Sequence, residues 1–257
     1  LALSGSACLA ISQSGQSPDI VRTARMAHEA GALTLALTNE AQSPLAGVAH
    51  HALPLCAGME RSVAATKTFV TSAVLAVWLL AELARDEALR LAIHALPQRL
   101  SEALALDWGE AAAVAGRARS LFCLGRGPSN AMAGEAALKF KETSQLHAEA
   151  YSSAEVLHGP VSIVAEGFPV IALAAADAAE EGLVAVSDTL AKRGARVFVT
   201  TTRETHANTL PVVRTGHPLT DPIAVIVSFY AMVEAVAVAR GLDPDTPRHL
   251  KKVTQTQ

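Results

Sequence analysis

One pattern occurs twice in this chain of 257 residues and limits the folds open to it. A short apolar segment is followed by a loop of small or polar residues, a helix, a glycine and a second apolar segment. The two copies read ACLAISQSGQSPDIVRTARMAHEAGALTLALTN and PVIALAAADAAEEGLVAVSDTLAKRGARVFVTTT, with Gly31 and Gly194 at matching places. Short apolar strands that alternate with helices predict parallel sheets with helices on both faces. We therefore expect two similar doubly wound α/β subdomains.

A further strand–turn–helix unit precedes the second copy. Residues 121–124 form an apolar run suited to a buried strand, and Gly125–Asn130 is a turn rich in glycine that also supplies an N-cap. A helix is predicted from Ala131 onward. No such unit precedes the first copy, so we expect an N-terminal portion to be missing. The predicted subdomains are 1–106 and 107–242, followed by a tail at 243–257.

The remaining elements follow from apolar periodicity and from turn residues. A helix at 63–83 is predicted to be buried, and a helix at 86–106 is predicted to be interrupted at Pro97. Strands are expected at 7–11, 33–37, 53–55, 169–174, 196–200 and 212–213, and further helices at 178–193 and 222–240.

Composition narrows the functional class. The chain is 51% hydrophobic and 18% charged, which suits an α/β protein with a large core better than a disordered chain. A net charge of -3 gives no electrostatic footprint for nucleic acid. The apolar stretch 70–83 is too short to cross a bilayer, so no membrane is expected. Three cysteines without Cys-x-x-Cys spacing predict neither a disulfide framework nor a zinc site and favour the cytoplasm.

The loop of the first copy is the candidate anion site. Its residues are Ser12-Gln13-Ser14-Gly15-Gln16-Ser17, between a predicted strand and a helix that starts at Pro18. Hydroxyl groups and the N–H groups of a helix N-terminus can hold a phosphate without a lysine. The alternative is a polar turn with a capping serine.

A second candidate is a line of charges on the helix after Asn130. Glu135, Lys139 and Glu142 fall at i, i+4 and i+7, so they share one helix face. The alternative is a solvent-exposed face held by Glu–Lys pairs. The less periodic segment that follows carries Glu149, Glu155 and His158, the last fixed by the turn Gly159-Pro160. The proline-stiffened tail after Asp243 could fold over a site as a lid, and the alternative is a frayed terminus.

Four segments in this order resemble the tandem sugar-isomerase (SIS) module of glucosamine-6-phosphate synthase and its relatives. They are ISQSGQSPD, SVAATKTF, GRGPSNAMAGEAALKFKETSQLHAEAYSSAEVLHGP and DPDTPRHLKK. The resemblance covers nearly the whole chain and implies a flavodoxin-like fold in each subdomain. It also implies a sugar 6-phosphate substrate, no metal or organic cofactor, and a homodimer.

The resemblance assigns roles position by position. Ser12, Gln13, Ser14 and Ser17 look like the loop that binds the sugar phosphate, and Val63 and Ala64 look like backbone positions that line the sugar. Glu142 is similar to the glutamate that moves a proton between C1 and C2, with Lys139 and Glu135 beside it. His158 resembles the histidine that assists ring opening in the site of a neighbouring subunit. Lys252 resembles the tail lysine that forms a Schiff base with the ketose, and Lys251 is its alternative.

The departures from the synthase pattern point to shorter relatives. This chain has SGQSPD in place of SGETAD, AEVLHGP in place of GELKHGP, and no glutamine-hydrolysing domain. The lead hypothesis is an amino-sugar-phosphate deaminase/isomerase that converts glucosamine 6-phosphate to fructose 6-phosphate and ammonia through an enolamine or enediol. The alternatives are the isomerase half of a glutamine–fructose-6-phosphate aminotransferase and a non-catalytic sugar-phosphate-binding regulator.

Overall fold

The computed structural model describes residues 2–250 and 252. By its internal contacts the chain divides into two compact units. Unit 1 comprises Leu1–Leu79 with His249–Gln257, and unit 2 comprises Leu80–Arg248. The boundaries predicted at 106/107 and 242/243 rest on the sequence repeat, not on contacts. The division into compact units does not test them, and they stay a prediction.

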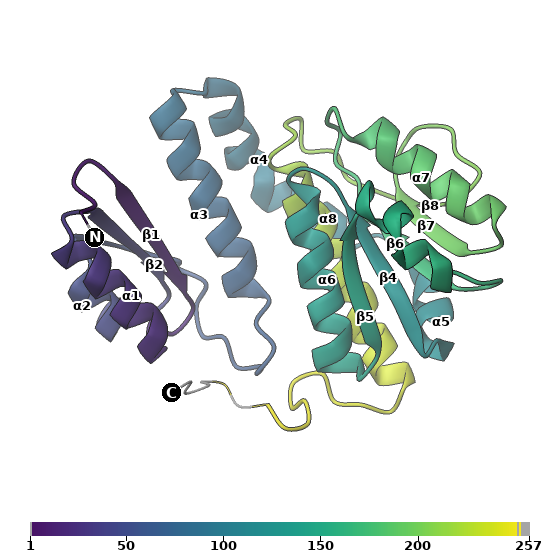
Figure 1. Cartoon of the computed structure of the whole chain (residues 1–257), viewed down its shortest axis with the longest axis horizontal. Coiled ribbons are helices and arrows are strands. Elements are labelled where there is room, and N and C mark those ends of the chain that lie inside the picture. The colour runs from purple at the N-terminus through teal and green to yellow at the C-terminus, as the bar shows by residue number, and fades with distance from the viewer. Residues whose placement is uncertain (1, 251, 253–257) are drawn as a thin grey trace. The chain divides into compact units, whose positions relative to one another are not determined.

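Unit 1 is built on a parallel sheet in the order β1-β2-β3. The helices α1 and α2 pack on each other and on the sheet (Figure 1). Small and branched side chains such as Val21, Ala24 and Leu45 form the core between them. The elements are β1 (Ala7–Ser12), α1 (Pro18–Glu29), β2 (Leu33–Thr38), α2 (Pro44–Val48) and β3 (His51–Pro54).

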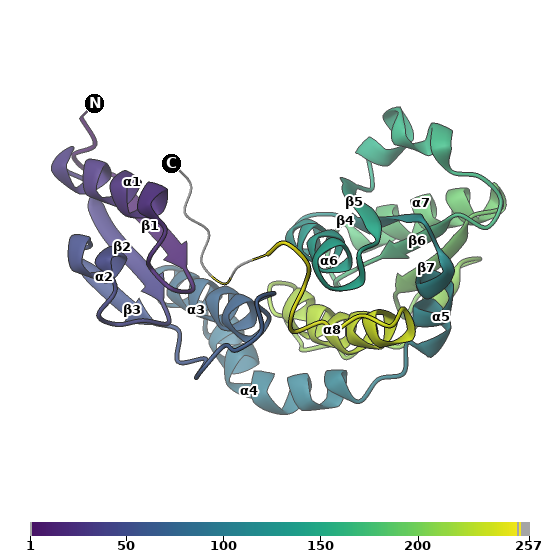
Figure 2. The same ribbon diagram turned by 90° about the horizontal axis from the view of Figure 1, so that it is seen from below.

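Unit 2 contains a parallel sheet of five strands in the order β5-β4-β6-β7-β8. This is the flavodoxin-like order, and helices cover both faces, with α6 and α8 on one and α7 on the other (Figure 2). The predicted fold class is confirmed. The elements are α4 (Glu87–Leu104), α5 (Gly109–Arg117), β4 (Ser120–Gly125), α6 (Ser129–Ser144), β5 (His147–Ser152), the 3₁₀ turns η1 (Glu155–His158) and η2 (Pro160–Ile163), β6 (Pro169–Ala172), α7 (Glu180–Lys192), β7 (Arg196–Thr200), β8 (Asn208–Leu210) and α8 (Asp221–Ala239).

The internal repeat is visible in the backbone. The run β1-α1-β2 corresponds to β6-α7-β7, and both helices end in the same way. Gly31 and Gly194 each have a φ of +92°, and the next amide bonds back five residues, from Ala32 to Ala27 and from Ala195 to Leu190. Glycine adopts a positive φ without the steric cost of a Cβ, which explains why it stands at this place in both copies.

Several predicted elements are wrong in place or kind. The chain at 147–152 is a strand, β5, that was expected to be irregular, and residues 212–213 are not a strand because β8 lies at Asn208–Leu210. β3 begins two residues before the predicted strand. Pro97 does not interrupt α4, which is continuous from Glu87 to Leu104. α6 begins at Ser129 with Pro128 as its N-cap, so the predicted polar cap is absent there.

The helix α3 (Lys67–Ala84) differs most from its prediction. It starts four residues later than expected, and most of its side chains are only partly buried, with Leu83 84% exposed. By length and hydropathy, α3 and α8 could each cross a membrane. The apolar character of α8 is accounted for by its burial in the core of unit 2, against α4, α5 and α6.

Candidate active site

The serine loop of unit 1 leaves the carboxyl end of β1 and enters α1. Ser12 accepts a hydrogen bond from the Gly15 amide at 3.1 Å, and Ser14 accepts one from the Gln16 amide at 3.3 Å. Ser17 is the N-cap residue of α1, yet its side chain makes no capping hydrogen bond. The N-terminus of α1 therefore retains donors and a hydroxyl group that can bind an anion.

Gly15 is required by the shape of this loop. Its φ is +61°, and a Cβ at this position would lie 2.2 Å from Ser43 Oγ and 2.5 Å from Ser43 Cβ. The carbonyl of Gly15 also accepts a hydrogen bond from the Leu45 amide at 3.1 Å. The loop is thus tied to α2, whose N-cap is Ser43. A residue with a side chain would separate the two segments.

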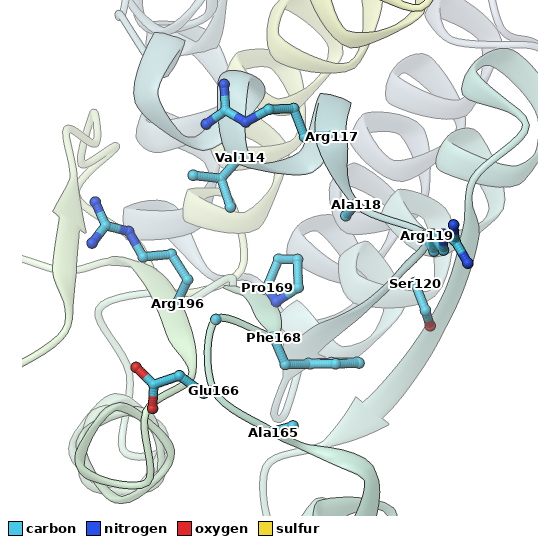
Figure 3. Close-up of a pocket in the computed structure, with 11 residues that line it drawn as sticks. Val114, Arg117, Ala118, Arg119, Ser120, Ala165, Glu166, Phe168, Pro169 and Arg196 are labelled. Atoms are coloured by element: carbon cyan, nitrogen blue, oxygen red, sulfur yellow. The ribbon is translucent and has the colours of Figure 1, made fainter.

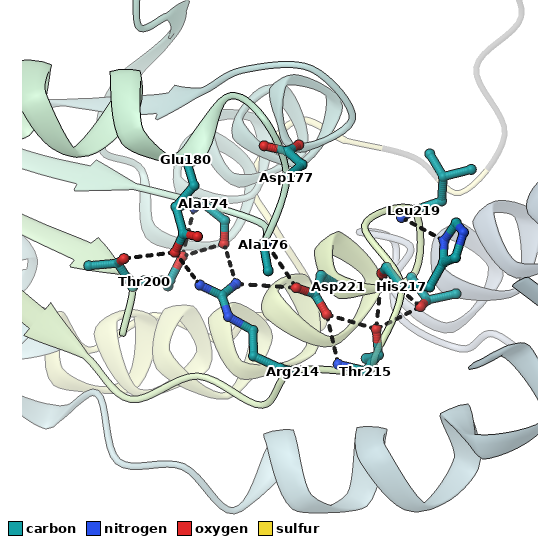
Figure 4. Close-up of polar contacts among 12 residues, drawn as sticks. Ala174, Ala176, Asp177, Glu180, Thr200, Arg214, Thr215, His217, Leu219 and Asp221 are labelled. Carbon is teal, nitrogen blue, oxygen red and sulfur yellow. Dashed lines mark hydrogen bonds and ion pairs between the residues drawn. The ribbon is translucent and has the colours of Figure 1, made fainter. Parts of the chain in front are cut away.

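The matching loop in unit 2, between β6 and α7, is closed by side chains of the loop itself, of β7 and of α8 (Figure 4). It reads LAAADAA and carries no hydroxyl group. Its backbone amides are already bonded: Ala174 to Thr200 Oγ1 at 2.7 Å, Ala176 to Asp221 Oδ2 at 2.9 Å, and Ala179 to Asp177 Oδ1 at 2.8 Å. Arg214 braces the same network through Glu180 and Asp221. Two carboxylates and the Thr200 hydroxyl therefore occupy donors that a phosphate would need, which leaves the serine loop as the candidate phosphate site.

Asn39 connects the serine loop to the segment before α3. Its backbone amide donates to the Gln13 carbonyl at 3.0 Å. Its side chain accepts from the Ala57 amide at 3.0 Å and donates to the Gly58 carbonyl at 2.7 Å. One residue, through its backbone amide and its side chain, therefore connects the loop to the segment that leads to Val63 and Ala64.

The loop before α3 is held by three charged side chains. Glu60 accepts from both the amide and the hydroxyl of Thr68 at 2.8 Å, which caps α3. Lys67 donates to the Met59 carbonyl at 2.6 Å, and Lys252 of the tail donates to the Ser62 carbonyl. The structure thus brings Lys252 to the neighbour of Val63, whereas Lys251 lies outside the described residues.

In unit 2, the predicted charges on α6 form one buried cluster. Lys139 Nζ lies 2.5 Å from Glu142 Oε2 and 3.4 Å from Glu135 Oε1. The side chains of Lys139 and Glu135 are 4% and 6% exposed, whereas that of Glu142 is 21% exposed. The alternative of a solvent-exposed helix face is wrong. Among the three groups, Glu142 is the one whose carboxylate is open to a substrate.

Burial has an electrostatic consequence for this cluster. The loss of solvent raises the pKa of Glu135 above its ordinary value, while Lys139 and a hydrogen bond from Tyr230 oppose the rise. Tyr230 belongs to α8, and its hydroxyl donates to Glu135 Oε1 at 2.8 Å. Two carboxylates therefore flank one ammonium group, and a phenol donates to one of them.

His158 is the last residue of η1 and is exposed. Among the described residues it makes no hydrogen bond or ion pair with Glu142 or with any other side chain, and its assigned role stays a prediction. Within residues 2–250 and 252, which the structure describes, no group of three or more His, Cys, Asp and Glu side chains is arranged to hold a metal ion.

A hollow of about 630 Å³ in unit 2 lies at the amino ends of the sheet strands, away from the carboxyl ends where ligand loops gather (Figure 3). It includes Ser120, Pro169 and Arg196, the first residues of β4, β6 and β7. Parallel α/β sheets bind ligands beyond the carboxyl ends of their strands, and none of the predicted site residues lines this hollow. We therefore place the candidate site elsewhere.

Comparison with known proteins agrees with these features. The family model for the SIS domain matches residues 2–83 and 117–239. The chain belongs to the SIS domain family. A glutamine–fructose-6-phosphate aminotransferase from Aeropyrum pernix is 35% identical to this SIS chain over 269 residues, with 97% of the chain and 43% of the relative covered. The chain thus spans less than half the length of the curated relatives it matches.

Two solved structures are similar to the SIS chain as a whole. A candidate phosphosugar isomerase from Silicibacter pomeroyi is 60% identical, with a TM-score of 0.92, over 95% of this chain and 75% of that one. The C-terminal domain of a glucosamine-fructose-6-phosphate aminotransferase from Francisella tularensis is 25% identical, with a TM-score of 0.78, over 96% of this chain and 75% of that one.

Sequence reasoning missed three residues that hold the candidate groups in place. Asn39 follows a strand directly, at the edge where ligand loops gather, and this position was a usable signal. Glu60 precedes the predicted helix start, but α3 begins only at Lys67, so its capping role was hidden. Tyr230 lies in a long apolar helix and is 95 residues away from Glu135, and no local pattern connects the two.

Proposed function

We propose that the chain is a phosphosugar isomerase that acts on a hexosamine 6-phosphate and releases ammonia. The reaction is glucosamine 6-phosphate plus water to fructose 6-phosphate plus ammonia. The buried cluster of Glu135, Lys139 and Glu142 carries this proposal, because it presents one accessible carboxylate next to a desolvated ammonium group. Moving a proton between adjacent carbons needs a positioned carboxylate of this kind.

Substrate binding begins at the serine loop. The donors at the N-terminus of α1 and the hydroxyl groups of Ser14 and Ser17 would hold the phosphate. The loop carries no lysine or arginine, so binding depends on oriented N–H and O–H groups and on the helix dipole. The backbone at Val63 and Ala64 would line the sugar.

The chemical steps follow from the open-chain aldehyde. His158 would move the proton that opens the ring, since imidazole titrates near neutral pH. Glu142 would then take the proton from C2 and return it to C1 by way of an enolamine. The product is an imine at C2, and attack by water breaks the C–N bond and releases ammonia. The Lys252 amine, in its unprotonated form, could exchange with this imine through a Schiff base that water then hydrolyses.

The test is ammonia release by the intact protein from glucosamine 6-phosphate without glutamine, with galactosamine 6-phosphate alongside. We expect release from the glucosamine compound and a loss of at least about 100-fold in kcat for Glu142→Gln, since the substitution removes the base. The matched control is Glu110→Gln, which removes an exposed carboxylate paired with Arg196 in the same unit. Sugar-phosphate binding without turnover would contradict the proposal and favour a regulator.

A second candidate is the isomerase half of a glutamine–fructose-6-phosphate aminotransferase. The relatives from Aeropyrum pernix and Francisella tularensis favour it, since each is named a fructose-6-phosphate aminotransferase. In that case ammonia would come from glutamine hydrolysed by another domain. Glucosamine 6-phosphate formed from fructose 6-phosphate and glutamine by the intact protein would establish this candidate, and amination with ammonium salt alone would exclude a need for glutamine.

The resemblance also leads us to propose a homodimer in which His158 serves the site of the partner subunit. The exposure of His158, without a polar partner among the described residues, supports this proposal. The substrate is proposed to be the only ligand, with no nucleic acid or membrane as partner.

A further inference from the structure

The chain contains two tyrosines, and both donate a hydrogen bond to a glutamate. Tyr151 donates to Glu149 Oε2 at 2.5 Å within β5, where both side chains are partly exposed. Tyr230 donates to Glu135 Oε1 at 2.8 Å, from α8 across to α6. The second bond reaches a carboxylate that is almost fully buried, where each hydrogen bond has a larger effect than at the surface.

The same oxygen of Glu135 connects the phenol to the ammonium group. Glu135 Oε1 is 2.8 Å from the Tyr230 hydroxyl and 3.4 Å from Lys139 Nζ, and Lys139 Nζ is 2.5 Å from Glu142. Lys139 is therefore shared unequally between two carboxylates. Whether Glu135 is ionised decides how much of the ammonium charge acts on Glu142.

Few of the titratable groups near Glu135 affect whether its carboxylate is ionised. The helix α6 packs on β4, β5 and α8; besides Tyr230, the titratable side chains of α8 are Glu234, which is exposed, and Asp221, which pairs with Arg214. The titratable side chain of β4 is the Cys123 thiol, whose pKa burial raises, so it remains neutral. On β5, Glu149 and Tyr151 bond each other and His147 bonds Ser120. The pKa of Glu135 is raised mainly by burial, and Lys139 and Tyr230 are the groups that lower it, while Glu142 adds to the rise.

We propose that Tyr230 is a positioning residue: its hydroxyl keeps the Glu135 carboxylate ionised, so that Lys139 is shared and Glu142 stays basic enough to take a proton from carbon. A protonated Glu135 would leave the whole ammonium charge to Glu142, and a carboxylate next to an uncompensated cation is a weaker base. The inference rests on the proposed function for its catalytic part. Its electrostatic part rests on the cluster alone.

The variant that tests it is Tyr230→Phe, which removes only the hydroxyl. Losing a hydrogen bond to an ionised carboxylate raises its pKa by about one unit. On this proposal the acid limb of the kcat profile follows the ionisation of Glu135, so it should move to higher pH by about one unit, and kcat on that limb should fall about tenfold with little change in KM. Tyr151→Phe is the matched control, and its profile should coincide with that of the wild type.

Glu135→Gln supplies the second test. Since glutamine does not titrate, adding Tyr230→Phe to Glu135→Gln should cause no further shift of the profile. A merely structural role of Tyr230 predicts instead the same loss at every pH and in both backgrounds. That result, or a change confined to KM, would overturn the proposal.

A spectroscopic titration separates this inference from the proposed reaction. Protein labelled with ¹³C at the glutamate side-chain carboxyl is titrated by NMR, and the Glu135 resonance is assigned as the one missing in Glu135→Gln. We expect its midpoint to rise in Tyr230→Phe and to be unchanged in Tyr151→Phe. An equal midpoint in Tyr230→Phe and wild type would refute the inference even if the enzyme is active. A raised midpoint in a protein inactive on every sugar phosphate would retain it and remove only the proposed reaction.

Discussion

At the scale of single residues, the candidate site depends on positions where adding or removing a few atoms would disrupt the local structure. Gly15 is the clearest case in unit 1, because its φ is +61° and Ser43 fills the space that a Cβ would need. A buried ammonium between two carboxylates is the corresponding case in unit 2. Removing one partner from a buried ion cluster leaves an uncompensated charge, so these positions tolerate little change.

Gly15→Ala should destabilise unit 1 and weaken phosphate binding. An alanine at this φ is strained and meets Ser43 at 2.2 Å, so we expect the free energy of unfolding to fall by about 1–3 kcal/mol. KM for the sugar phosphate should rise, because the loop can no longer approach α2. Denaturant unfolding and steady-state kinetics measure the two effects. Gly47→Ala is the control, since a Cβ there meets nothing within 4 Å, and an equal loss in both variants would contradict the argument.

The residue scale also shows what spacing alone can predict. The positions of Glu135, Lys139 and Glu142 predicted one shared helix face, and the structure confirms their contact. Spacing did not show that the face is buried, because its neighbours on α8 and β5 are distant in sequence. Ser129 shows the same limit: it was expected among capping residues, yet its hydroxyl is buried and has no hydrogen-bond partner among the described residues.

At the scale of elements, strong apolar runs were predictable and weak ones were not. β1, β2 and β7 lie within one residue of prediction, because each is a run of apolar residues bounded by a glycine or polar loop. β5 was missed because it alternates alanine with polar residues, and its strand conformation comes from pairing with β4 at the sheet edge. Pro97 was expected to break a helix, but packing of α4 on α8 outweighs the lost hydrogen bond.

Glu60→Ala tests the element that carries Val63 and Ala64. Glu60 is 8% exposed and accepts two hydrogen bonds at the start of α3. Its removal leaves the Thr68 amide and hydroxyl unpaired, so we expect a loss of about 1–2 kcal/mol in stability and faster hydrogen exchange in residues 59–68. Glu40→Ala, at an exposed glutamate of the same unit, should change neither quantity. Unchanged exchange in Glu60→Ala would show that the tail and Lys67 hold this loop without the cap.

At the scale of the whole molecule, the repeat explains why only one of two matching loops is a candidate phosphate site. Each loop follows a strand of a parallel sheet, β1 at an edge or β6 at the centre, and leads into a helix. In unit 1 the loop carries three serines and the Ser17 side chain makes no capping hydrogen bond, whereas in unit 2 carboxylates and Arg214 close the loop. One copy of the unit thus offers ligand contacts, while the other stabilises its own sheet. The sequence already indicated this difference, since one loop reads SQSGQS and the other AAADAA.

The proposed exchange of His158 between subunits can be tested by mixing two inactive variants. Glu142→Gln and His158→Ala each remove one group, so each homodimer should be inactive. If His158 serves the partner's site, a mixed dimer contains one site with both groups intact. Random mixing of equal amounts then restores about a quarter of the wild-type activity per subunit, because half of the dimers are mixed and each has one working site. If His158 serves its own subunit, every site lacks one group and no activity returns. Mixing Glu142→Gln with Glu142→Gln/His158→Ala is the control that should stay inactive in either case, because no subunit then supplies Glu142.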